Sequence, residues 1–338
     1  KKQREVVMPS IDILSIGNAI VDIIARCDDK FLEDNDIIKG AMNLIDADRA
    51  EHLYARMGPA IEASGGSACN TAAGAAGFGA KTALFAKVCN DQLGEIFTHD
   101  IRALGTEFNS LPLEGNPPTA RSMVFITPDA ERTFNTYLGA CVEIGPEDVD
   151  EKVVADSKVT YFEGYLWDPP RAKDAIRLAA KIAHENGRKI AGSLSDSFCV
   201  DRHRDEFLQL ITSGTIDIVF ANEDEIKSLY QTESFDEAIK RLGRDCALGT
   251  VTRGPKGSVV VQGDQVIEVA GHVVDNIVDT SGAGDLYAAG FLYGYTQDLD
   301  LTKCAELGNF IASQIIQQIG PRLQVSPYDL AKEAGLLA

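Results

Sequence analysis

The sequence predicts an α/β fold in which helices flank a central, mostly parallel sheet and a small β element is added to it. Three observations support this prediction. Strand-like and helix-like segments alternate through the second half of the chain, hairpin-like strands are concentrated in the first half, and no internal repeat or low-complexity linker interrupts the 338 residues. We therefore expect one domain that spans residues 1–338.

The first half of the chain holds short strand-like runs. Strands are expected at residues 11–16, 21–25, 42–45 and 81–88. A glycine-rich stretch at 65–79 precedes the last of these, and a helix is expected at 92–104. Residues 119–137 are rich in Thr, Val, Phe and Ile and are broken by the turn-forming residues 127–130. That pattern is typical of a β-hairpin.

The second half alternates strands with helices at the spacing of βαβ units, which predicts a parallel sheet. Strands are expected at 159–162, 189–191, 216–220 and 248–252, and a hairpin at 258–262 and 265–269. Helices are expected at 171–186, 201–212, 223–230, 284–297 and 301–318. In open parallel sheets, ligands bind at the carboxyl ends of the strands. Asn18, Asn222 and Arg253 each follow a predicted strand, so we expect them to share one rim.

The composition is that of a soluble globular protein, with 45% apolar and 25% charged residues. No apolar run approaches the ~20 residues that span a bilayer, and the first ten residues lack the apolar core of a secretory signal. The seven cysteines are scattered, without a CxxC pair. This argues against a disulfide framework and a structural zinc site. We expect a cytoplasmic protein that does not bind membranes.

The net charge of −19 makes nucleic acid an unsuitable partner, because so acidic a surface repels a phosphate backbone. If the protein acts on phosphates, its positive groups must be placed locally, on helix starts, a few Arg or Lys side chains and a bound metal.

The motif DTSGAGD at 279–285, which runs directly into the helix at 284–297, carries the most chemical information. Its glycines let the backbone approach a ligand, and the helix start offers free N–H groups to an anion. Asp285 stands at that start, where a carboxylate can accept a proton from an attacking hydroxyl. The combination suits phosphoryl transfer to an alcohol. An Asp that caps a helix after a glycine turn is the alternative that the pattern leaves open.

A second glycine-rich segment, GGSACN at 65–70, precedes a run of Ala and Gly. Asn70 can both donate and accept hydrogen bonds, as a polyhydroxylated ligand requires. The Ala and Gly residues that follow are better explained by tight packing of a helix against the sheet.

Three further segments each allow two interpretations. Asn222 and Glu225 could hold waters around Mg²⁺, or they could cap a helix. Residues 252–258, with two glycines beside Arg253 and Lys256, could border a nucleotide or form an ordinary turn between strands. Arg132 could close over a phosphate or lie in a surface turn.

Other catalytic classes lack their motifs. There is no P-loop, HExxH or GxSxG sequence, and a GxGxxG pattern fails because Tyr287 stands where the third glycine belongs. The five histidines are dispersed, which disfavours a catalytic triad or a zinc hydrolase.

The order GGSACN, ANEDE, TRGPKG and DTSGAGD resembles the ribokinase-like (PfkB) family of small-molecule kinases over roughly residues 11 to 320. Within that family, the chain is most similar to adenosine kinases. Gly17-Asn18 with Asp22, then Phe31-Leu32, the 43–54 stretch and Gly65-Gly66-Ser67 resemble their nucleoside-binding half.

The resemblance implies a ribokinase-like fold, with a small β-sheet lid formed by segments of about 18–47 and 117–138. It implies ATP as phosphoryl donor, with Mg²⁺. Asp285 would be the base for the CH₂OH group of the acceptor. The N–H groups of Gly282, Ala283 and Gly284 would form an anion hole, and Arg132 on the lid would stabilise the transferred charge.

The resemblance also implies the binding residues. The acceptor ribose would be bound by Asn18, Asp22, Gly65, Gly66, Ser67 and Asn70. Candidates for packing on its base are Phe134, Leu138 and Tyr165. ATP would be bordered by Asn222, Thr252, Gly254, Gly257 and Asn309. Mg²⁺ would be held through waters by Asn222 and Glu225, and K⁺ near Asp279 and Ser281.

Three functions remain open at this point. The first is transfer of phosphate from ATP to the 5′-hydroxyl of adenosine, giving AMP. The second is a sugar kinase on the same fold, acting on ribose, fructose or 2-keto-3-deoxygluconate. The third is a nucleotide-binding regulator without catalysis. The partners would be the small-molecule substrate and ATP, and the protein would be a monomer or homodimer.

Overall fold

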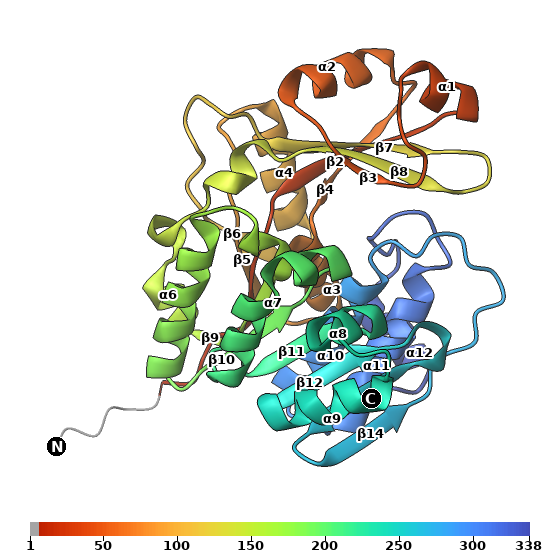
Figure 1. Cartoon of the computed structure of the whole chain (residues 1–338). Coiled ribbons are helices and arrows are strands. Elements are labelled where there is room, and N and C mark those ends of the chain that lie inside the picture. Colours follow the sequence, from red (N-terminus) through yellow and green to blue (C-terminus); the bar gives the residue numbers. More distant parts are fainter. Residues whose placement is uncertain (1–6) are drawn as a thin grey trace.

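The larger of the two sheets is the scaffold of the molecule. The computed structural model describes residues 7–338, and within them nine strands form this sheet in the order β14-β13-β12-β11-β10-β9-β1-β5-β6 (Figure 1). The strands are β1 (Ile11–Ile16), β5 (Thr82–Phe85), β6 (Thr106–Phe108), β9 (Ser157–Glu163), β10 (Lys189–Ser193), β11 (Ile218–Asn222), β12 (Leu248–Thr252), β13 (Ser258–Gln262) and β14 (Gln265–Val269). The pairs from β6 through β12 are parallel, whereas β13 and β14 join as an antiparallel hairpin.

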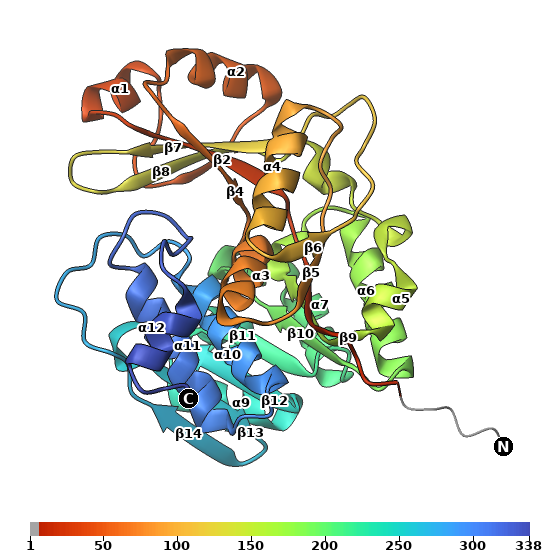
Figure 2. The same ribbon diagram turned by 180° about the vertical axis from the view of Figure 1, so that it is seen from behind.

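Helices bury both faces of this sheet, which is why its parallel strands are apolar along most of their length. One face packs against α5 (Glu151–Ala155), α6 (Ala172–Glu185), α7 (Ser197–Thr212), α8 (Glu223–Tyr230) and α9 (Phe235–Asp245). The other face, in front in Figure 2, is covered by α3 (Ser67–Phe78), α10 (Ala283–Thr296) and α11 (Leu301–Ile315), with α12 (Pro327–Glu333) packed outside them.

The second sheet lies above the carboxyl ends of the parallel strands, at the top of Figure 1. It has five strands in the order β3-β8-β7-β2-β4. These are β3 (Met42–Leu44), β8 (Arg132–Tyr137), β7 (Ala120–Ile126), β2 (Ile20–Arg26) and β4 (Ile61–Gly65). Its outer face is covered by α1 (Asp29–Asp34) and α2 (Ala47–Arg56), while α4 (Gln92–Ala103) packs against β4 and β6.

Side chains alternate along the strands of the second sheet, and this decides which of them face the large sheet. On β2, Val21 and Ile23 are buried in the core that contains α1 and α2. Asp22, which lies between them, therefore points to the opposite, inner face. On β8, Arg132 reaches Asp279 of the larger part of the molecule, so Phe134, two residues further on, shares that inner face.

The predicted α/β architecture is confirmed, and the predicted strands, hairpins and helices are found with shifts at their ends. The strand expected at 81–88 ends at Phe85, and Lys87 beyond it forms an ion pair with Asp148. Four short 3₁₀ helices were not anticipated, at Gly139–Glu143, Pro146–Asp148, Gly164–Trp167 and Gly254–Lys256. Elements also missed are α1, α2, α5, α9, α12, β4 and β6.

The omission of α9 was avoidable. Phe235, Ala238, Ile239 and Leu242 are buried at helical spacing, and Ser234 caps the helix by accepting a hydrogen bond from the Glu237 N–H. By contrast, β6 has only three residues, too few for an alternating pattern to stand out.

Helices α10 and α11 pack backbone to backbone at Gly290, and this contact is testable. A Cβ atom at Gly290 would lie 2.8 Å from the Leu307 carbonyl oxygen. We expect Gly290→Val to lower the free energy of unfolding by about 1–3 kcal/mol, the usual cost of overpacking a core. Gly58→Val is the control, because Gly58 is exposed and a Cβ there meets no atom within 4 Å. Urea unfolding measures both, and equal stabilities would contradict the close packing of α10 and α11.

Candidate active site

The residues of the candidate site come from loops and helix starts at the carboxyl ends of the parallel strands. The chain leaves β1 through Gly17-Asn18 and enters α3 through Gly65-Gly66. Gly66 has φ +101°, and a Cβ atom there would lie 2.1 Å from the Asn18 carbonyl oxygen. Only glycine fits, so the two segments that were predicted to bind the acceptor are in backbone contact.

Asp285 is the centre of the site. Its Oδ1 accepts a hydrogen bond of 2.6 Å from the Ser67 hydroxyl, and its Oδ2 accepts one of 3.1 Å from the Asn70 amide. The Thr71 hydroxyl donates to the Asp285 carbonyl oxygen at 3.0 Å. Burial raises the pKa of Asp285, while the two side-chain donors and the nearby charge of Arg322 lower it. The start of α3 therefore fixes the orientation of this carboxylate.

The start of α10 presents backbone N–H groups beside this carboxylate. Gly282 adopts φ +78° as the N-cap of the helix. The Ala283 N–H donates to the Thr280 carbonyl at 3.3 Å, whereas among residues 7–338 the Gly282 and Gly284 N–H groups donate to no other group. A Cβ atom at Gly284 would meet no atom within 4 Å, so that turn has space in front of it. Free N–H groups at a helix start suit an anion.

Glu163, at the end of β9, connects the two segments that were predicted to bind the phosphoryl acceptor. Its carboxylate accepts the Asn18 N–H at 3.1 Å and the Ala68 N–H at 2.8 Å. The side chain is 1% exposed, and burial raises its pKa to about 7. It also packs against Gly17, where a Cβ atom would lie 2.6 Å from its Oε2 atom.

Two residues that were predicted to bind the acceptor ribose have oxygen atoms free to accept further hydrogen bonds. The Oδ1 atom of Asn18 is enclosed and has no partner among the described residues. Asp22 lies against Gly65, where a Cβ atom would approach its carboxylate to 2.5 Å. Burial raises the pKa of Asp22 to about 6, although Arg322 and Arg132 lower it. A buried acceptor without a donor is what a hydroxyl-bearing ligand would satisfy.

Arg132 connects the second sheet to the loop before α10. Its Nε atom lies 2.6 Å from Asp279 Oδ2, and both side chains are buried. The Asp279 carboxylate also accepts the N–H groups of Ser281 at 3.0 Å and Gly320 at 3.1 Å. The predicted phosphate-binding arginine and the predicted K⁺ ligand are therefore paired with each other.

Asn222 and Glu225 form the helix cap that the sequence also allowed. The Asn222 Oδ1 atom accepts the Glu225 N–H at 2.8 Å, and the Asn222 N–H donates to Glu225 Oε1 at 3.3 Å. Burial raises the pKa of Glu225 to about 7. Asn222 is exposed at the end of β11 and pairs in register with Thr252 on β12. The oxygen donors of this pair fit Mg²⁺ held through water.

The other predicted ATP residues gather around the end of β14. A Cβ atom at Gly257 would lie 2.1 Å from the Val269 carbonyl oxygen, and the Asn309 amide donates to the same carbonyl at 3.1 Å. Gly254 adopts φ +56° and faces open space. Arg253 turns away to pair with Glu223 and to lie over the ring of Phe235.

Within residues 7–338, the three predicted base-packing residues form no hydrogen bond with the Asp285 carboxylate, which is held by Ser67 and Asn70. Phe134 is half-buried on the inner face of the second sheet, and Leu138 is half-buried just beyond β8. On β3, Met42 pairs with Phe134 and is 59% exposed. Tyr165 follows β9, and its N–H donates to the Ser195 hydroxyl. The inner face thus offers apolar surface opposite the polar acceptor segments.

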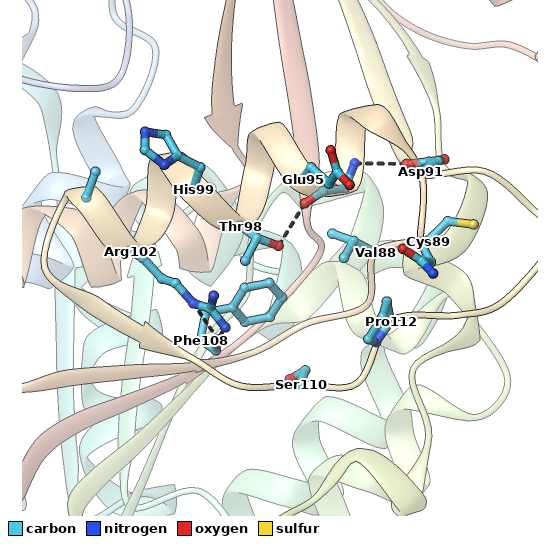
Figure 3. Close-up of a pocket in the computed structure, with 13 residues that line it drawn as sticks. Val88, Cys89, Asp91, Glu95, Thr98, His99, Arg102, Phe108, Ser110 and Pro112 are labelled. Carbon is cyan, nitrogen blue, oxygen red and sulfur yellow. Dashed lines mark hydrogen bonds between the residues drawn. The ribbon is translucent and has the colours of Figure 1, made fainter.

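A separate hollow of about 600 Å³ lies beside α4, as Figure 3 shows. Thr98, His99 and Arg102 line it from the helix, and Phe108 and Pro112 line it from the chain that follows. Its lining residues all fall between residues 88 and 112, so this hollow is distinct from the Asp285 site.

In the part of the chain from residue 7 onward, no three His, Cys, Asp or Glu side chains converge as a metal site. Over the same residues, no helix has the length and apolar character needed to cross a bilayer.

The fold and this site define a kinase of small molecules. The sequence model described as pfkB family carbohydrate kinase matches residues 12–327, and the chain belongs to this family of phosphotransferases with an alcohol acceptor. A solved structure of adenosine kinase from Sinorhizobium meliloti is 66% identical, covers 96% of this chain and 99% of its own, and has a TM-score of 0.90.

Two other proteins are similar over nearly the whole chain. A solved structure of a probable sugar kinase from Rhizobium etli is 60% identical, with 98% of this chain and 100% of its own covered and a TM-score of 0.92. Adenosine kinase from Saccharomyces cerevisiae is 27% identical over 333 residues, which cover 91% of this chain and 96% of the yeast protein.

Sequence reasoning missed two residues of the site. Glu163 directly follows a predicted strand, so the rule that pointed to Asn18 and Asn222 would have found it. Arg322 donates from Nε to Asn70 Oδ1 at 2.9 Å. It lies beyond the last long helix, after Gly320-Pro321, and no motif marks it.

The raised pKa of Glu163 predicts how its contribution to stability varies with pH. Its folded pKa of about 7 exceeds the ordinary value of 4.5, so its contribution is complete below pH 4.5 and is lost as the pH rises through 7. We expect Glu163→Gln to destabilise the protein more at pH 5 than at pH 8. Urea unfolding at both values measures this, with the exposed Glu62→Gln as control. A difference that grows with pH would contradict the raised pKa.

Proposed function

We propose that this kinase transfers the γ-phosphoryl group of ATP to the 5′-hydroxyl of adenosine, giving AMP and ADP. The observation that carries the proposal is the Asp285 carboxylate, held by Ser67 and Asn70 beside free N–H groups at the start of α10. The similarity to the 66% identical adenosine kinase from Sinorhizobium meliloti supports adenosine as acceptor.

Asp285 acts as general base in this proposal. It accepts the proton of the 5′-hydroxyl while that oxygen forms its bond to the γ-phosphorus, and the bond from phosphorus to the β-phosphate oxygen breaks as ADP leaves. The N–H groups of Gly282, Ala283 and Gly284 stabilise the charge of the migrating group. For the Ala283 N–H, this requires release of its long bond to Thr280.

The acceptor is oriented by the residues between β1 and α3. Asp22 and the unpartnered Asn18 Oδ1 accept hydrogen bonds from the ribose hydroxyls, and Gly65 and Gly66 let the sugar approach the backbone. Phe134, Leu138 and Tyr165 pack on the base. We propose that the second sheet acts as a lid over this acceptor within one domain, with Arg132 brought to the phosphates.

ATP is bordered by Asn222, Thr252, Gly254, Gly257 and Asn309. Asn222 and Glu225 hold Mg²⁺ through waters, and the metal neutralises phosphate charge when bound. We also propose that K⁺ binds near Asp279 and Ser281. The protein is further proposed to be cytoplasmic and to be a monomer or homodimer.

A sugar kinase is the second candidate, and the 60% identical relative named as a probable sugar kinase favours it. It would use the same base at Asp285. The exposed apolar side chains Met42 and Leu44 on the inner face favour a nucleoside, since a free sugar has no aromatic base to cover them. A regulator without catalysis is the weakest candidate, because the carboxylate and N–H groups that catalysis needs are present.

An acceptor panel distinguishes these functions. ADP release from MgATP is measured with adenosine, inosine, guanosine, cytidine, ribose, fructose and 2-keto-3-deoxygluconate. Turnover with adenosine supports the proposal. Turnover with a sugar and none with adenosine assigns the chain to the second candidate, and nucleotide binding without turnover of any acceptor supports the regulator.

The role of Asp285 predicts a large effect on turnover. Asp285→Asn keeps the shape of the side chain but removes the base, so kcat should fall by roughly 10²- to 10⁴-fold. The affinity for MgATP, measured by calorimetry, should change little. Near-normal kcat in the folded variant would remove Asp285 from this role.

The raised pKa of Asp22 predicts how binding of the acceptor depends on pH. Because protonation takes up one acceptor oxygen of the carboxylate and removes its charge, the hydrogen bonds from the ribose hydroxyls weaken, and the KM for adenosine should rise as the pH falls through about 6. Asp22→Asn should raise this KM and abolish its rise below pH 6. A wild-type KM that is constant from pH 5 to 8 would contradict the assignment.

A further inference from the structure

Arg322 is a half-buried residue whose Nη atoms are enclosed beside the site, and sequence motifs did not point to it. Its Nε–H donates to Asn70 Oδ1 at 2.9 Å, while Nη1 and Nη2 are enclosed without a hydrogen-bond partner among the described residues. Burying a guanidinium with unpaired nitrogens costs stability. Such a group is better explained by a role in the site than by a role in folding.

We propose that Arg322 is a positioning residue for Asp285 that acts through the side-chain amide of Asn70. This inference rests on the kinase function proposed above, and it adds a residue to the machinery of that reaction.

The chemistry of the three side chains fixes the direction of the hydrogen bonds. An Arg Nε–H can only donate, so it selects the oxygen of the Asn70 amide. The NH₂ end of that amide must then face the Asp285 carboxylate, to which it donates at 3.1 Å. Without Arg322, only the carboxylate still selects the NH₂ end, and the amide loses the contact that fixes its position. The base would then be held by a less firmly oriented donor.

The charge of Arg322 acts on the same carboxylate. Burial raises the pKa of Asp285, and Arg322 is among the groups that lower it. Arg322 similarly lowers the pKa of Asp22, which burial raises to about 6. A positive charge that acts on both carboxylates favours their ionised forms, which accept a proton and hydroxyl hydrogen bonds.

Other titratable groups face Asp285 from β9, the turn after it, and α3. They are Tyr161, Glu163, Tyr165 and Cys69. Burial raises the pKa values of the two tyrosines and the cysteine, so these groups stay neutral near pH 7. Glu163, with a pKa of about 7, titrates in the same range. Because Glu163 is present in every variant compared, its titration contributes equally to each pH profile.

The first test compares Arg322→Gln, Arg322→Lys and Arg188→Gln in acceptor turnover as a function of pH. Arg188 is the matched control, because it bonds the Ala155 carbonyl before β10, at the opposite end of the sheet from Asp285. We expect Arg322→Gln to lower kcat by ~10- to ~100-fold, the scale of a misplaced catalytic group. In this variant, the acid limb of the plot of kcat against pH should shift to higher pH by about one unit. Arg322→Lys should restore the limb but only part of kcat, and Arg188→Gln should match the wild type.

A double-mutant cycle tests whether Arg322 acts through Asn70. Asn70→Ala removes the amide, so adding Arg322→Gln should lower kcat little further, while the acid limb still shifts because the charge is lost. If the two effects on kcat instead multiply, Arg322 does not act through Asn70. If Arg322→Gln changes only the KM of the acceptor, Arg322 is a binding residue, and the proposal is wrong.

A readout that needs no acceptor separates this inference from the proposed function. The carboxyl ¹³C resonance of Asp285, assigned with Asp285→Asn, is titrated in the wild type and in Arg322→Gln. A rise of about one unit in the pKa supports the inference even if no acceptor is turned over. An unchanged pKa together with unchanged kcat overturns it, whereas turnover of no acceptor overturns only the proposed function. Circular dichroism confirms that each variant is folded.

Discussion

The hydrogen bonds between the start of α3 and Asp285 at the start of α10 are the contact on which the site depends. Ser67 and Asn70 reach this carboxylate only because the two helices pack closely. A Cβ atom at Gly74 would lie 2.9 Å from both Ala289 and Leu286, so a larger residue would separate them. The small residues of α3 that serve packing therefore also set the geometry of the proposed base.

The hydrogen bonds from α3 also affect the protonation of this buried carboxylate, the proposed base. Burial alone favours the protonated acid, which cannot accept a proton. Two side-chain donors and the charge of Arg322 oppose that effect. For Glu163, the pKa is lowered by two backbone donors, and burial still raises it to about 7. Within one site, the surroundings thus differ between the carboxylate proposed as the base and the carboxylate that joins two loops.

The sequence predicted most of the fold and the centre of the site, because both depend on local patterns. DTSGAGD and GGSACN combine glycine conformations with adjacent polar groups, and each lies in one short segment. The role of Arg322 was not predicted, because its partner, Asn70, is 252 positions away in the chain. The pairing of Arg132 with Asp279 was not predicted for the same reason. Only tertiary packing decides how the second sheet lies relative to the loop before α10.

The Arg132–Asp279 pair bears on how the second sheet would work as a lid. Arg132 is buried against a carboxylate that also accepts two backbone N–H groups, so its charge is neutralised where phosphates are expected to bind. An incoming phosphate or a cation at Asp279 must compete for one member of this pair. The cost of separating a buried pair is large unless both charges find new partners. Release of Arg132 is therefore favoured only when an anion for the arginine and a cation or water for Asp279 arrive together, which would couple lid position to occupancy of the phosphate site.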